Sequence, residues 1–332
     1  MTKTLCLVLV AASSLFVAAG CKPSTNATSD AGSASSEKKI AVQLNWYAEA
    51  EHGGVYQAKA DGTYDAAGLN VEIRPGGRAT PVAAEVVMGR ADFAITNADD
   101  VVLFRAAGSD IVALTAAMQD NPRCIMVNKN SDVTTWEGLK GMTLQRQEGQ
   151  GFVEFLRARG MLNGIQEVPY HGSVSNLVSD PKIAVQAYSF AEPYLAKEAG
   201  ADVNTLMVSD LGWNPYSSVL VTRGELVRKN PELVRAFVEA TNAGWQHYLT
   251  DPEKGNAAIL AANQHGMTAD ALTFGSAALV SLARPDDMDI DQVGKMTDER
   301  WTQLVDTMVQ LKMIEAGKVK PEDCFTNQFL RP

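Results

Sequence analysis

The sequence predicts an α/β protein of two lobes, in which the chain forms one lobe, crosses to a second and returns to complete the first. Strand and helix patterns alternate from residue 39 to about residue 221, and helical patterns fill the rest. The length of 332 residues also favours two domains, because single cores stop growing at about this size. Two lobes joined by two crossings enclose a cleft that can close on a small molecule.

The first lobe begins with a strand over residues 39–46, where apolar and polar residues alternate before a polar loop. The elements expected next are a helix at 53–60, a strand at 71–73, a helix at 81–89 and strands at 92–96 and 111–117. Asn97 is placed to cap a helix that begins at Asp99. This alternation predicts a parallel sheet.

The second lobe begins at a strand that can cross over, at 124–127. It continues with a strand at 142–145, a helix from Gly149 to Arg159, a strand at 183–188 and a helix at 190–198. A strand at 217–221 returns to the first lobe, and helices follow at 225–229, 231–249, 253–263, 269–283 and 297–314. We therefore assign residues 39–126 and 221–332 to lobe 1 and residues 127–220 to lobe 2.

The N-terminus has the pattern of an export signal. A positive Lys3 precedes an apolar run at 5–16, and small residues at 17–20 lead directly to Cys21. This resembles a bacterial lipoprotein signal, which implies a signal peptide at 1–20 and lipidation of Cys21. The alternative is an ordinary secretory signal with an incidental cysteine. Residues 21–38 are polar and small, so they are expected to form a flexible tether.

Composition excludes several classes of protein. With 29 basic and 39 acidic residues the formal charge is −10, and no basic cluster favours nucleic acid as a partner. The apolar run near the N-terminus is too short for a membrane-spanning helix. Export and two remaining thiols suggest a disulfide between Cys124 and Cys324. No cysteine or histidine spacing indicates a metal site.

Several motifs resemble those of one family of solute-binding proteins. The first strand ends in Asn45-Trp46, and His52-Gly53-Gly54 follows in the next loop. Further motifs are Gly-Leu-Asn-Val-Glu-Ile at 68–73, Gly-Arg-Ala-Asp-Phe-Ala at 89–94 and Ala-Glu-Pro-Tyr at 191–194. From residue 39 onward the chain resembles the binding proteins of ABC importers for nitrate, sulfonates, taurine and thiamine-precursor pyrimidines. The resemblance implies a type II periplasmic binding-protein fold with two hinge crossings.

The Asn45-Trp46 pair resembles the thiamine-pyrimidine branch, which is also similar to an enzyme, thiamine-pyrimidine synthase. The resemblance implies for that enzyme a pyridoxal-phosphate lysine, a histidine and a cysteine-rich run. Here the residues at the position of the lysine are Thr96-Asn97-Ala98, which include no Lys. The counterpart of the cysteine-rich run falls near residues 214–218, which include no Cys. The missing residues, together with the export signal, favour transport over catalysis.

Candidate ligand contacts in lobe 1 follow the ends of its strands, where open α/β sheets bind ligands. Trp46 can stack on a flat ring, and Asn45 can offer an amide to the edge of the ring. His52 and Gly53 open a helix whose backbone N–H groups can hold a polar group, although a glycine-rich turn explains them nearly as well. Asn97 is expected to face the cleft, although helix capping also explains it.

In lobe 2 the candidates occupy three corresponding junctions. Gln147 and Glu148 precede the glycines of the helix at residue 149, while Arg146 is explained as well by a surface ion pair as by an anion. Tyr188 and Glu192 bracket another turn, where a carboxylate can accept two hydrogen bonds from an aminopyrimidine or can simply stabilise the helix. Two further candidates precede the returning strand, Asn214 and Tyr216.

These observations favour the substrate-binding component of an ABC importer, anchored by a lipid on Cys21 and facing the periplasm or the cell exterior. We expect a monomer without cofactor or metal that binds a small heteroaromatic solute, above all a thiamine-precursor aminopyrimidine. It would deliver this ligand to an ABC permease in the inner membrane. Two alternatives stay open: a synthase-like enzyme, and the same transport role with a sulfonate, nitrate or riboflavin-like ligand.

Overall fold

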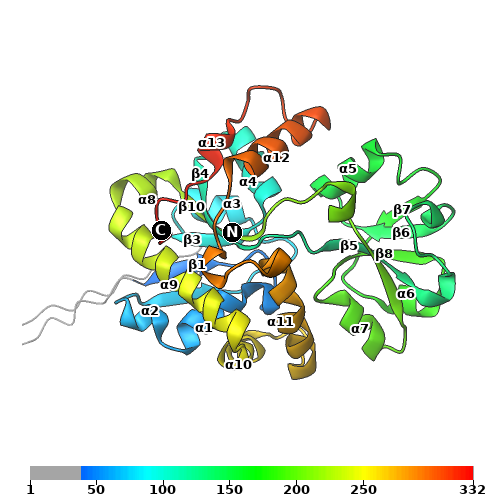
Figure 1. The fold of residues 1–332 in the computed structure, drawn as a ribbon, viewed down its shortest axis with the longest axis horizontal. Coiled ribbons are helices and arrows are strands. Elements are labelled where there is room, and N and C mark those ends of the chain that lie inside the picture. Colours follow the sequence, from blue (N-terminus) through cyan, green and yellow to red (C-terminus); the bar gives the residue numbers. More distant parts are fainter. Residues whose placement is uncertain (1–38, 332) are drawn as a thin grey trace, which may run out of the picture. The chain divides into compact units, whose positions relative to one another are not determined.

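The structure is a computed structural model that describes residues 39–331, and the predicted signal peptide, tether and lipidation site Cys21 lie outside these residues. The described chain builds two five-stranded sheets. We call the part that contains the first sheet lobe 1 (residues 39–118 and 217–331) and the part that contains the second sheet lobe 2 (residues 123–207). Figure 1 shows the two lobes joined by two chain segments, 119–122 and 208–216. The predicted two-lobed α/β architecture is thereby confirmed.

The sheet of lobe 1 is mixed, whereas the sequence predicted a parallel sheet. Its strands, in spatial order, are β2 (Val71–Arg74), β1 (Ile40–Gln43), β3 (Phe93–Thr96), β10 (Ser217–Arg223) and β4 (Ile111–Met118). β1 pairs in parallel with β2 and β3, but β10 runs antiparallel to both β3 and β4. The chain leaves this sheet at the carboxyl end of β4 and returns at the same edge, so β10 has to run in the opposite direction.

The sheet of lobe 2 has the same pattern, with antiparallel pairs at the strand that enters from lobe 1. Its strands, in spatial order, are β7 (Gln166–Pro169), β6 (Thr143–Arg146), β8 (Ile183–Tyr188), β5 (Arg123–Asn128) and β9 (Val203–Met207). β6 pairs in parallel with β7 and β8, and β5 is antiparallel to β8 and β9. The sequence did not predict β7 and β9. Both are edge strands with mostly half-buried or exposed residues, so they lack a clear apolar pattern.

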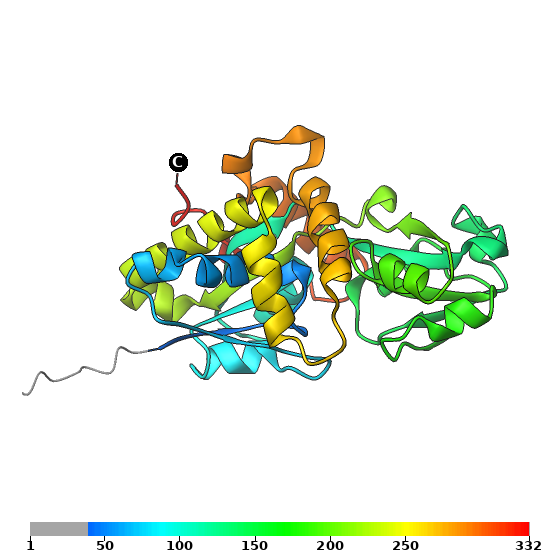
Figure 2. The same ribbon diagram turned by 90° about the horizontal axis from the view of Figure 1, so that it is seen from below.

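Helices cover both sheets, most of them close to their predicted positions, whereas the short helices at 63–66, 175–179 and 321–324 were not predicted. In lobe 1 they are α1 (Gly53–Ala60), α2 (Thr63–Ala66), α3 (Val82–Val87), α4 (Ala98–Ala106), α8 (Gly224–Lys229), α9 (Pro231–Thr250), α10 (Glu253–Ala262), α11 (Ala269–Ala283), α12 (Asp298–Gln310) and α13 (Pro321–Cys324). In lobe 2 they are α5 (Gly151–Ala158), α6 (Ser175–Ser179) and α7 (Glu192–Glu198). Figure 2 shows α11 on the side of lobe 1 that faces lobe 2.

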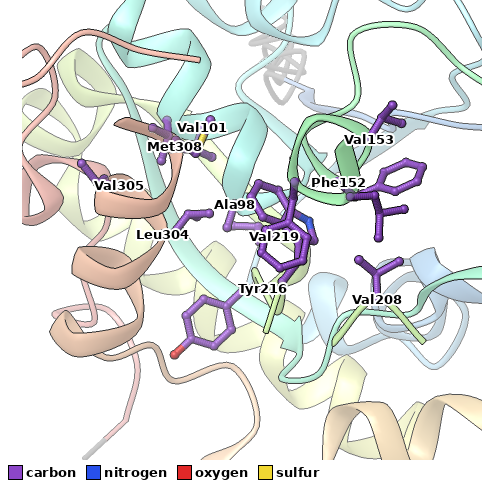
Figure 3. Packing of buried hydrophobic residues seen from close by; sticks show 14 of the residues in the cluster. Ala98, Val101, Phe152, Val153, Val208, Tyr216, Val219, Leu304, Val305 and Met308 are labelled. Atoms are coloured by element: carbon purple, nitrogen blue, oxygen red, sulfur yellow. The ribbon is translucent and has the colours of Figure 1, made fainter. Parts of the chain in front are cut away.

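One core cluster contains side chains from both lobes. Figure 3 shows Ala98 of α4, Val219 of β10 and Leu304 of α12 gathered there with Phe152 of α5. A second cluster packs β1 and β3 against α1 and α9, with Phe93 stacked on Phe237 at 3.9 Å between ring centroids. The apolar contacts therefore hold helices of lobe 1 against the first helix of lobe 2.

The predicted lobe boundaries fall inside two strands. The boundary after residue 126 divides β5, and the boundary after residue 220 divides β10, although each strand pairs within a single sheet. The apolar pattern of β5 and β10 could not show where the chain passes from one lobe to the other. A strand in a buried sheet is apolar along its whole length, so the pattern does not change at the boundary. The crossings are the segments that precede these strands, 119–122 before β5 and 208–216 before β10.

The predicted disulfide is absent from the structure. Cys124 on β5 and Cys324 in α13 are both free and buried. Their thiol groups face different carbonyl oxygens, Ala187 O for Cys124 and Lys320 O for Cys324, each at 3.6 Å. Cys124 belongs to the core of the lobe 2 sheet and Cys324 packs with α4 and α12, so the two cysteines serve as small apolar side chains in separate places.

Candidate functional site

The carboxyl ends of the strands in the two lobes meet each other. Asn97, which follows β3 in lobe 1, donates a hydrogen bond of 3.4 Å to the hydroxyl group of Tyr188 at the end of β8 in lobe 2. On another side Tyr194 of α7 packs against Phe274 of α11, with 5.5 Å between ring centroids. The lobes thus touch on both sides of the edge where open α/β sheets bind ligands.

Trp46 lies in the loop after β1 and is half-buried. Its ring packs at a tilt on Tyr47, with 5.0 Å between centroids. The Glu49 carboxyl group lies beside the Trp46 side chain and also near Glu192 of lobe 2. Trp46 and Glu192, predicted to belong to opposite lobes, are therefore both neighbours of one carboxyl group at the contact between the lobes.

His52 is fully buried, so its side chain supports the loop beneath the surface. Its Nε2 lies 2.9 Å from the Oδ1 atom of Asn45 and 3.5 Å from the carboxylate of Glu51. Burial lowers the pKa of His52 to about 3, so the imidazole is neutral near pH 7. His52 therefore acts as a buried support that fixes the side chains of Asn45 and Glu51.

Gly53 has a packing role in the structure. A Cβ atom at Gly53 would overlap the ring of Tyr248, and one at Gly54 would overlap Trp245, both on α9. The glycines therefore let α1 lie directly against α9. The sequence analysis had weighed a ligand-binding helix start against a glycine-rich turn, and the structure accounts for these glycines by helix packing instead.

Asn97 occupies the N-cap position of α4, but its side chain makes no capping hydrogen bond. Its Oδ1 instead accepts a hydrogen bond of 2.7 Å from the hydroxyl group of Ser217, and its amide nitrogen reaches Tyr188. The helix begins at residue 98, one position before the predicted start. Asn97 therefore connects β3, β10 and lobe 2, which capping alone would not do.

An acidic pair follows Asn97. The Asp100 carboxylate accepts a hydrogen bond of 2.9 Å from the Thr96 hydroxyl group. The Asp99 carboxylate faces lobe 2, where its Oδ2 lies 3.0 Å from the position that a Cβ of Gly151 would take. Gly151 begins α5, so the N-termini of two helices from opposite lobes meet at Asp99.

Arg123, which the sequence analysis did not single out, lies at the centre of these groups. It is the first residue of β5, directly after the first crossing. Its guanidinium group lies over the ring of Tyr188, 4.0 Å from the centroid, and near Phe152 at 4.9 Å. Its charge acts on Glu51, Asp99 and other nearby carboxyl groups.

Glu192 makes hydrogen bonds within its own lobe. Its Oε2 accepts a hydrogen bond of 2.7 Å from the backbone N–H of Tyr188, and its Oε1 lies 3.4 Å from the hydroxyl group of Tyr170. The residue begins α7, as its first-turn position suggested. The structural role that the sequence analysis had weighed equally is thus present, while the side chain stays near the carboxyl groups of lobe 1.

The loop before α5 contributes less than predicted. The backbone N–H of Gln147 donates a hydrogen bond of 2.6 Å to the side chain of Gln186, and Glu148 is exposed. Arg146 pairs with Glu167 at 2.8 Å, and Arg157 joins the same carboxylate. Arg146 is therefore engaged in an ion pair, which is the simpler of the two readings.

Asn214 and Tyr216 belong to the second crossing and hold it to the first. The Asn214 side chain accepts a hydrogen bond of 2.7 Å from the backbone N–H of Asn121 and donates one of 2.8 Å to Asp120. Tyr216 is buried, and its hydroxyl oxygen accepts a hydrogen bond of 3.0 Å from the backbone N–H of Thr297. These two residues therefore position the hinge.

Five carboxyl groups gather where the lobes meet, and the charge of Arg123 acts on all of them except Glu49. Burial is the main cause that raises the pKa of each: Glu51 to about 7, and the others above their ordinary values. Mutual repulsion adds to the effect, notably from Glu51 on Glu49 and from Asp100 on Asp99. The contact between the lobes is thus strongly acidic, and its members are Glu49, Glu51, Asp99, Asp100 and Glu192. We call these five residues the carboxyl cluster.

The sequence contained a signal for this cluster that the analysis did not use. An acidic pair follows β1 and another follows β3, and β1 and β3 are adjacent parallel strands. Carboxyl ends of adjacent parallel strands share one edge of the sheet, so the pairs had to be close. Arg123 carried no comparable signal, because only the fold places the start of β5 opposite that edge.

Within residues 39–331 no group of histidine, cysteine and acidic side chains is arranged to hold a metal ion. None of the helices there combines the length and the apolar character needed to cross a membrane.

Comparison with known proteins places the chain in a family. A family model described as NMT1/THI5 like matches residues 49–255, more than half of the 332 residues. The chain belongs to the NMT1/THI5-like family. The match spans α1 to the start of α10 and therefore includes both crossings and all of lobe 2.

Relatives of this family member include both binding proteins and synthases. It is 24% identical over 227 residues to the riboflavin-binding protein RibY of Chloroflexus aurantiacus, a match that covers 65% of this chain and 64% of the relative. It is 22% identical to a 4-amino-5-hydroxymethyl-2-methylpyrimidine phosphate synthase of Legionella pneumophila, covering 89% and 93% of the two chains. A formylaminopyrimidine-binding protein of Halalkalibacterium halodurans is 22% identical, with 67% and 69% covered.

Solved structures of similar fold include solute-binding proteins and also a desulfurization enzyme, DSZB, with a TM-score of 0.60 at 14% identity, covering 88% of this chain and 97% of the other. The ligand-binding component of an ABC-type import system from Staphylococcus aureus has a TM-score of 0.68 at 15% identity, covering 89% of this chain and 98% of the other. The aliphatic sulfonate-binding protein SsuA of Escherichia coli has a TM-score of 0.65 at 16% identity, covering 86% and 91%. The NMT1/THI5-like chain therefore has the periplasmic binding-protein fold that the sequence predicted.

Proposed function

We propose that this protein binds a small heteroaromatic solute between its lobes, most favourably a thiamine-precursor aminopyrimidine, and delivers it to an ABC permease. The observation that carries the proposal is the contact between Asn97 and Tyr188, which joins the carboxyl ends of strands from the two sheets. Open α/β sheets bind ligands at this edge, and the half-buried Trp46 follows β1, the strand next to β3. Trp46 and Tyr188 supply flat faces for a ring, and the amide of Asn97 supplies a directed hydrogen bond.

The chemistry of the site favours ligands with N–H groups over anions. Carboxylates accept hydrogen bonds from amino groups, whereas the carboxyl cluster repels a sulfonate or a nitrate. Arg146, the cation that the sequence offered for an anion, is paired with Glu167. Riboflavin and formylaminopyrimidine, named in two relatives, are both nitrogen heterocycles, which supports this choice.

We infer binding rather than catalysis, although some relatives carry the name of a synthase. The loop after β3 reads Thr96-Asn97-Ala98, without the lysine that a resemblance to the synthase would imply. The neighbouring His52 is fully buried against Asn45 and Glu51. Neither position offers an exposed nucleophile or an amine for covalent chemistry.

Export, anchoring and a monomeric state complete the proposal. The pattern at residues 1–20, followed by Cys21, supports a lipoprotein that faces the periplasm or the cell exterior. A tether at 21–38 would let the binding domain reach a permease in the same membrane.

A thermal-shift screen of residues 39–332 tests the ligand class. The probes are 4-amino-5-hydroxymethyl-2-methylpyrimidine, N-formyl-4-amino-5-aminomethyl-2-methylpyrimidine, riboflavin, ethanesulfonate and nitrate. A ligand at 100 times its Kd should stabilise the protein by about 2.7 kcal/mol and raise Tm. We expect stabilisation by at least one aminopyrimidine and none by the two anions. A shift with sulfonate or nitrate alone would contradict the proposal.

A further inference from the structure

The carboxyl cluster contains one member without a hydrogen-bond donor. Glu51 is 2% exposed, and no described residue donates a hydrogen bond to its carboxyl group. His52 lies 3.5 Å away, but the same Nε2 atom is 2.9 Å from Asn45, and the imidazole is neutral near pH 7. Burying a carboxylate without a hydrogen-bond donor or a cation costs free energy, so a ligand that supplies a donor or a positive charge at Glu51 would be stabilised there.

The protein itself does not neutralise the cluster. Arg123 is the cation closest to most of its members, yet no ion pair within 4.0 Å joins Arg123 to any of these carboxylates in the described part of the chain. Its guanidinium lies instead on the faces of Tyr188 and Phe152. Arg78 stands nearer to Tyr170 and Gly172, on the lobe 2 side. The charge of Arg123 therefore acts on four carboxyl groups, Glu51, Asp99, Asp100 and Glu192, without an ion pair to any of them within residues 39–331.

Some of the other carboxyl groups in the cluster do accept hydrogen bonds from the protein. Glu192 accepts a hydrogen bond from the backbone of Tyr188, and Asp100 accepts one from Thr96. Asp99 accepts hydrogen bonds only from backbone N–H groups, its own and that of Asp100, and Glu51 accepts none from any described residue. Glu51 lies in the short turn at 50–52 that follows β1, and Asp99 lies in the first turn of α4 after β3. The carboxyl groups without a side-chain donor, Glu51 and Asp99, thus both belong to lobe 1.

We propose that the ligand of this site carries a positive charge on or beside its flat ring, and that Glu51 with Asp99 binds that charge. The inference rests on the proposed function and narrows it to a cationic nitrogen heterocycle. A metal ion is disfavoured, because the described residues form no group with metal-binding geometry. An ammonium or amidinium group instead offers several N–H donors, which can reach carboxylates that lie too far apart to share one ion.

Two probes of nearly equal size test the inference. In 4-amino-5-aminomethyl-2-methylpyrimidine the 5-substituent ends in an ammonium group near neutral pH, whereas 4-amino-5-hydroxymethyl-2-methylpyrimidine ends in a neutral hydroxyl group. Calorimetry at pH 7.5 with residues 39–332 should show at least about tenfold tighter binding of the ammonium compound. Since Glu51 titrates near pH 7, the ratio of the two affinities should rise from pH 5.5 to pH 8. The groups that face Glu51 are Glu49, Glu192, Arg123, His52 and Tyr188.

Two isosteric variants assign the preference to named residues. Glu51→Gln should reduce the affinity ratio to about threefold or less, because the amide removes the charge but keeps the shape. Asp99→Asn provides a second, independent reduction if the first variant folds poorly. The matched control is Glu72→Gln, an exposed residue on β2 that pairs with Arg74, and it should leave the ratio unchanged.

The outcomes separate the inference from the function on which it rests. Equal affinities, or tighter binding of the hydroxymethyl compound, would overturn the cationic ligand and leave an aminopyrimidine-binding function in place. A preference that survives both Glu51→Gln and Asp99→Asn would overturn the assignment to these residues. If neither compound binds while riboflavin or another probe of the thermal-shift screen does, the aminopyrimidine ligand and the cationic inference both fail.

Discussion

At the scale of single residues, the loop after β1 assigns separate tasks to neighbouring side chains. Asn45 and His52 hold each other, with 2.9 Å between Oδ1 and Nε2, and they are therefore fixed beneath the contact between the lobes. Trp46 is half-buried in the same loop, and we propose that it contacts the ligand. Within these eight consecutive residues Asn45 and His52 hold the loop, while Trp46 would recognise the ligand.

The first prediction concerns Trp46. Trp46→Ala should weaken binding of 4-amino-5-hydroxymethyl-2-methylpyrimidine by about 2–3 kcal/mol, since a stacking face and its buried area are lost. Trp46→Phe keeps a ring and should recover most of this affinity. Isothermal titration calorimetry measures both. If the alanine variant binds as tightly as the parent protein, the stacking site lies elsewhere.

At the scale of elements, the close approach of α1 and α9 depends on glycine. A Cβ atom at Gly244 of α9 would overlap the backbone oxygen of Gly54 on α1, and backbone cannot move aside as a flexible side chain can. Gly244→Ala should therefore lower the free energy of unfolding by about 1–3 kcal/mol, despite the better helix propensity of alanine. Denaturant unfolding measures the change. Ala243→Ser adds one atom at a half-buried neighbouring position and should cost much less.

Arg300 of α12 connects the two crossings. Its guanidinium donates hydrogen bonds to the backbone oxygens of Gln119, at 2.5 Å, and Asn214, at 2.8 Å, and lies 3.7 Å from the ring centroid of Tyr216. Arg300→Ala leaves both carbonyl groups without this donor and should destabilise the protein by about 2–3 kcal/mol.

Hydrogen exchange locates the effect of Arg300→Ala. Exchange should accelerate at residues 119–122 and 212–216 more than in α5 or α7, because the hinge loses its tie while the helices of lobe 2 keep theirs. Arg331→Ala removes an exposed guanidinium paired with Glu239 and serves as the control. Uniform acceleration across both lobes would show that Arg300 stabilises the whole fold and has no particular role at the hinge.

At the scale of the whole molecule, the carboxyl cluster links pH to the contact between the lobes. The pKa of Glu51 is raised from an ordinary 4.5 to about 7, chiefly through burial. We expect opening of the lobes to return Glu51 to solvent and its pKa towards the ordinary value. Between these values the conformation with touching lobes binds more protons than a solvated, opened one, so its relative stability falls as pH rises. The unliganded protein should therefore open as pH rises from about 4.5 to 7.

Small-angle X-ray scattering tests this opening, because separated lobes increase the radius of gyration. The unliganded protein should have a larger radius at pH 8 than at pH 5, and Glu51→Gln should reduce the difference. The control variant Glu225→Gln alters an exposed carboxylate of α8 that pairs with Lys229, and it should change nothing. An equal or smaller radius at pH 8 would contradict the linkage.

The last prediction concerns the attachment of the molecule to a membrane. If Cys21 is lipidated, Cys21→Ser should move the protein from the membrane fraction to the soluble fraction, and labelled fatty acid should no longer be incorporated. Cys6→Ser, within the expected signal peptide, is the matched control and should leave anchoring intact. Fatty acid that still attaches to the Cys21→Ser protein would show that the anchor is elsewhere.

The sequence by itself determined the elements and the two-lobed fold. The helices over 53–60 and 269–283 and the strand over 183–188 occupy the predicted residues, because apolar periodicity, glycine and proline are local signals. The motifs around Asn45-Trp46 also indicated the family correctly. The edge strands β7 and β9 escaped prediction, since strands with little burial show little periodicity.

Only the tertiary structure decided how distant residues meet. The direction of β10 follows from the edge at which the chain returns, and no pattern within residues 217–223 encodes it. Arg123 joins the site because β5 starts opposite the ends of β1 and β3, while Cys124 beside it faces the core of lobe 2 and does not reach Cys324. The burial that raises the pKa values of the carboxyl cluster likewise comes from segments far apart in the sequence. Local sequence sets local conformation, whereas proximity and desolvation depend on the whole chain.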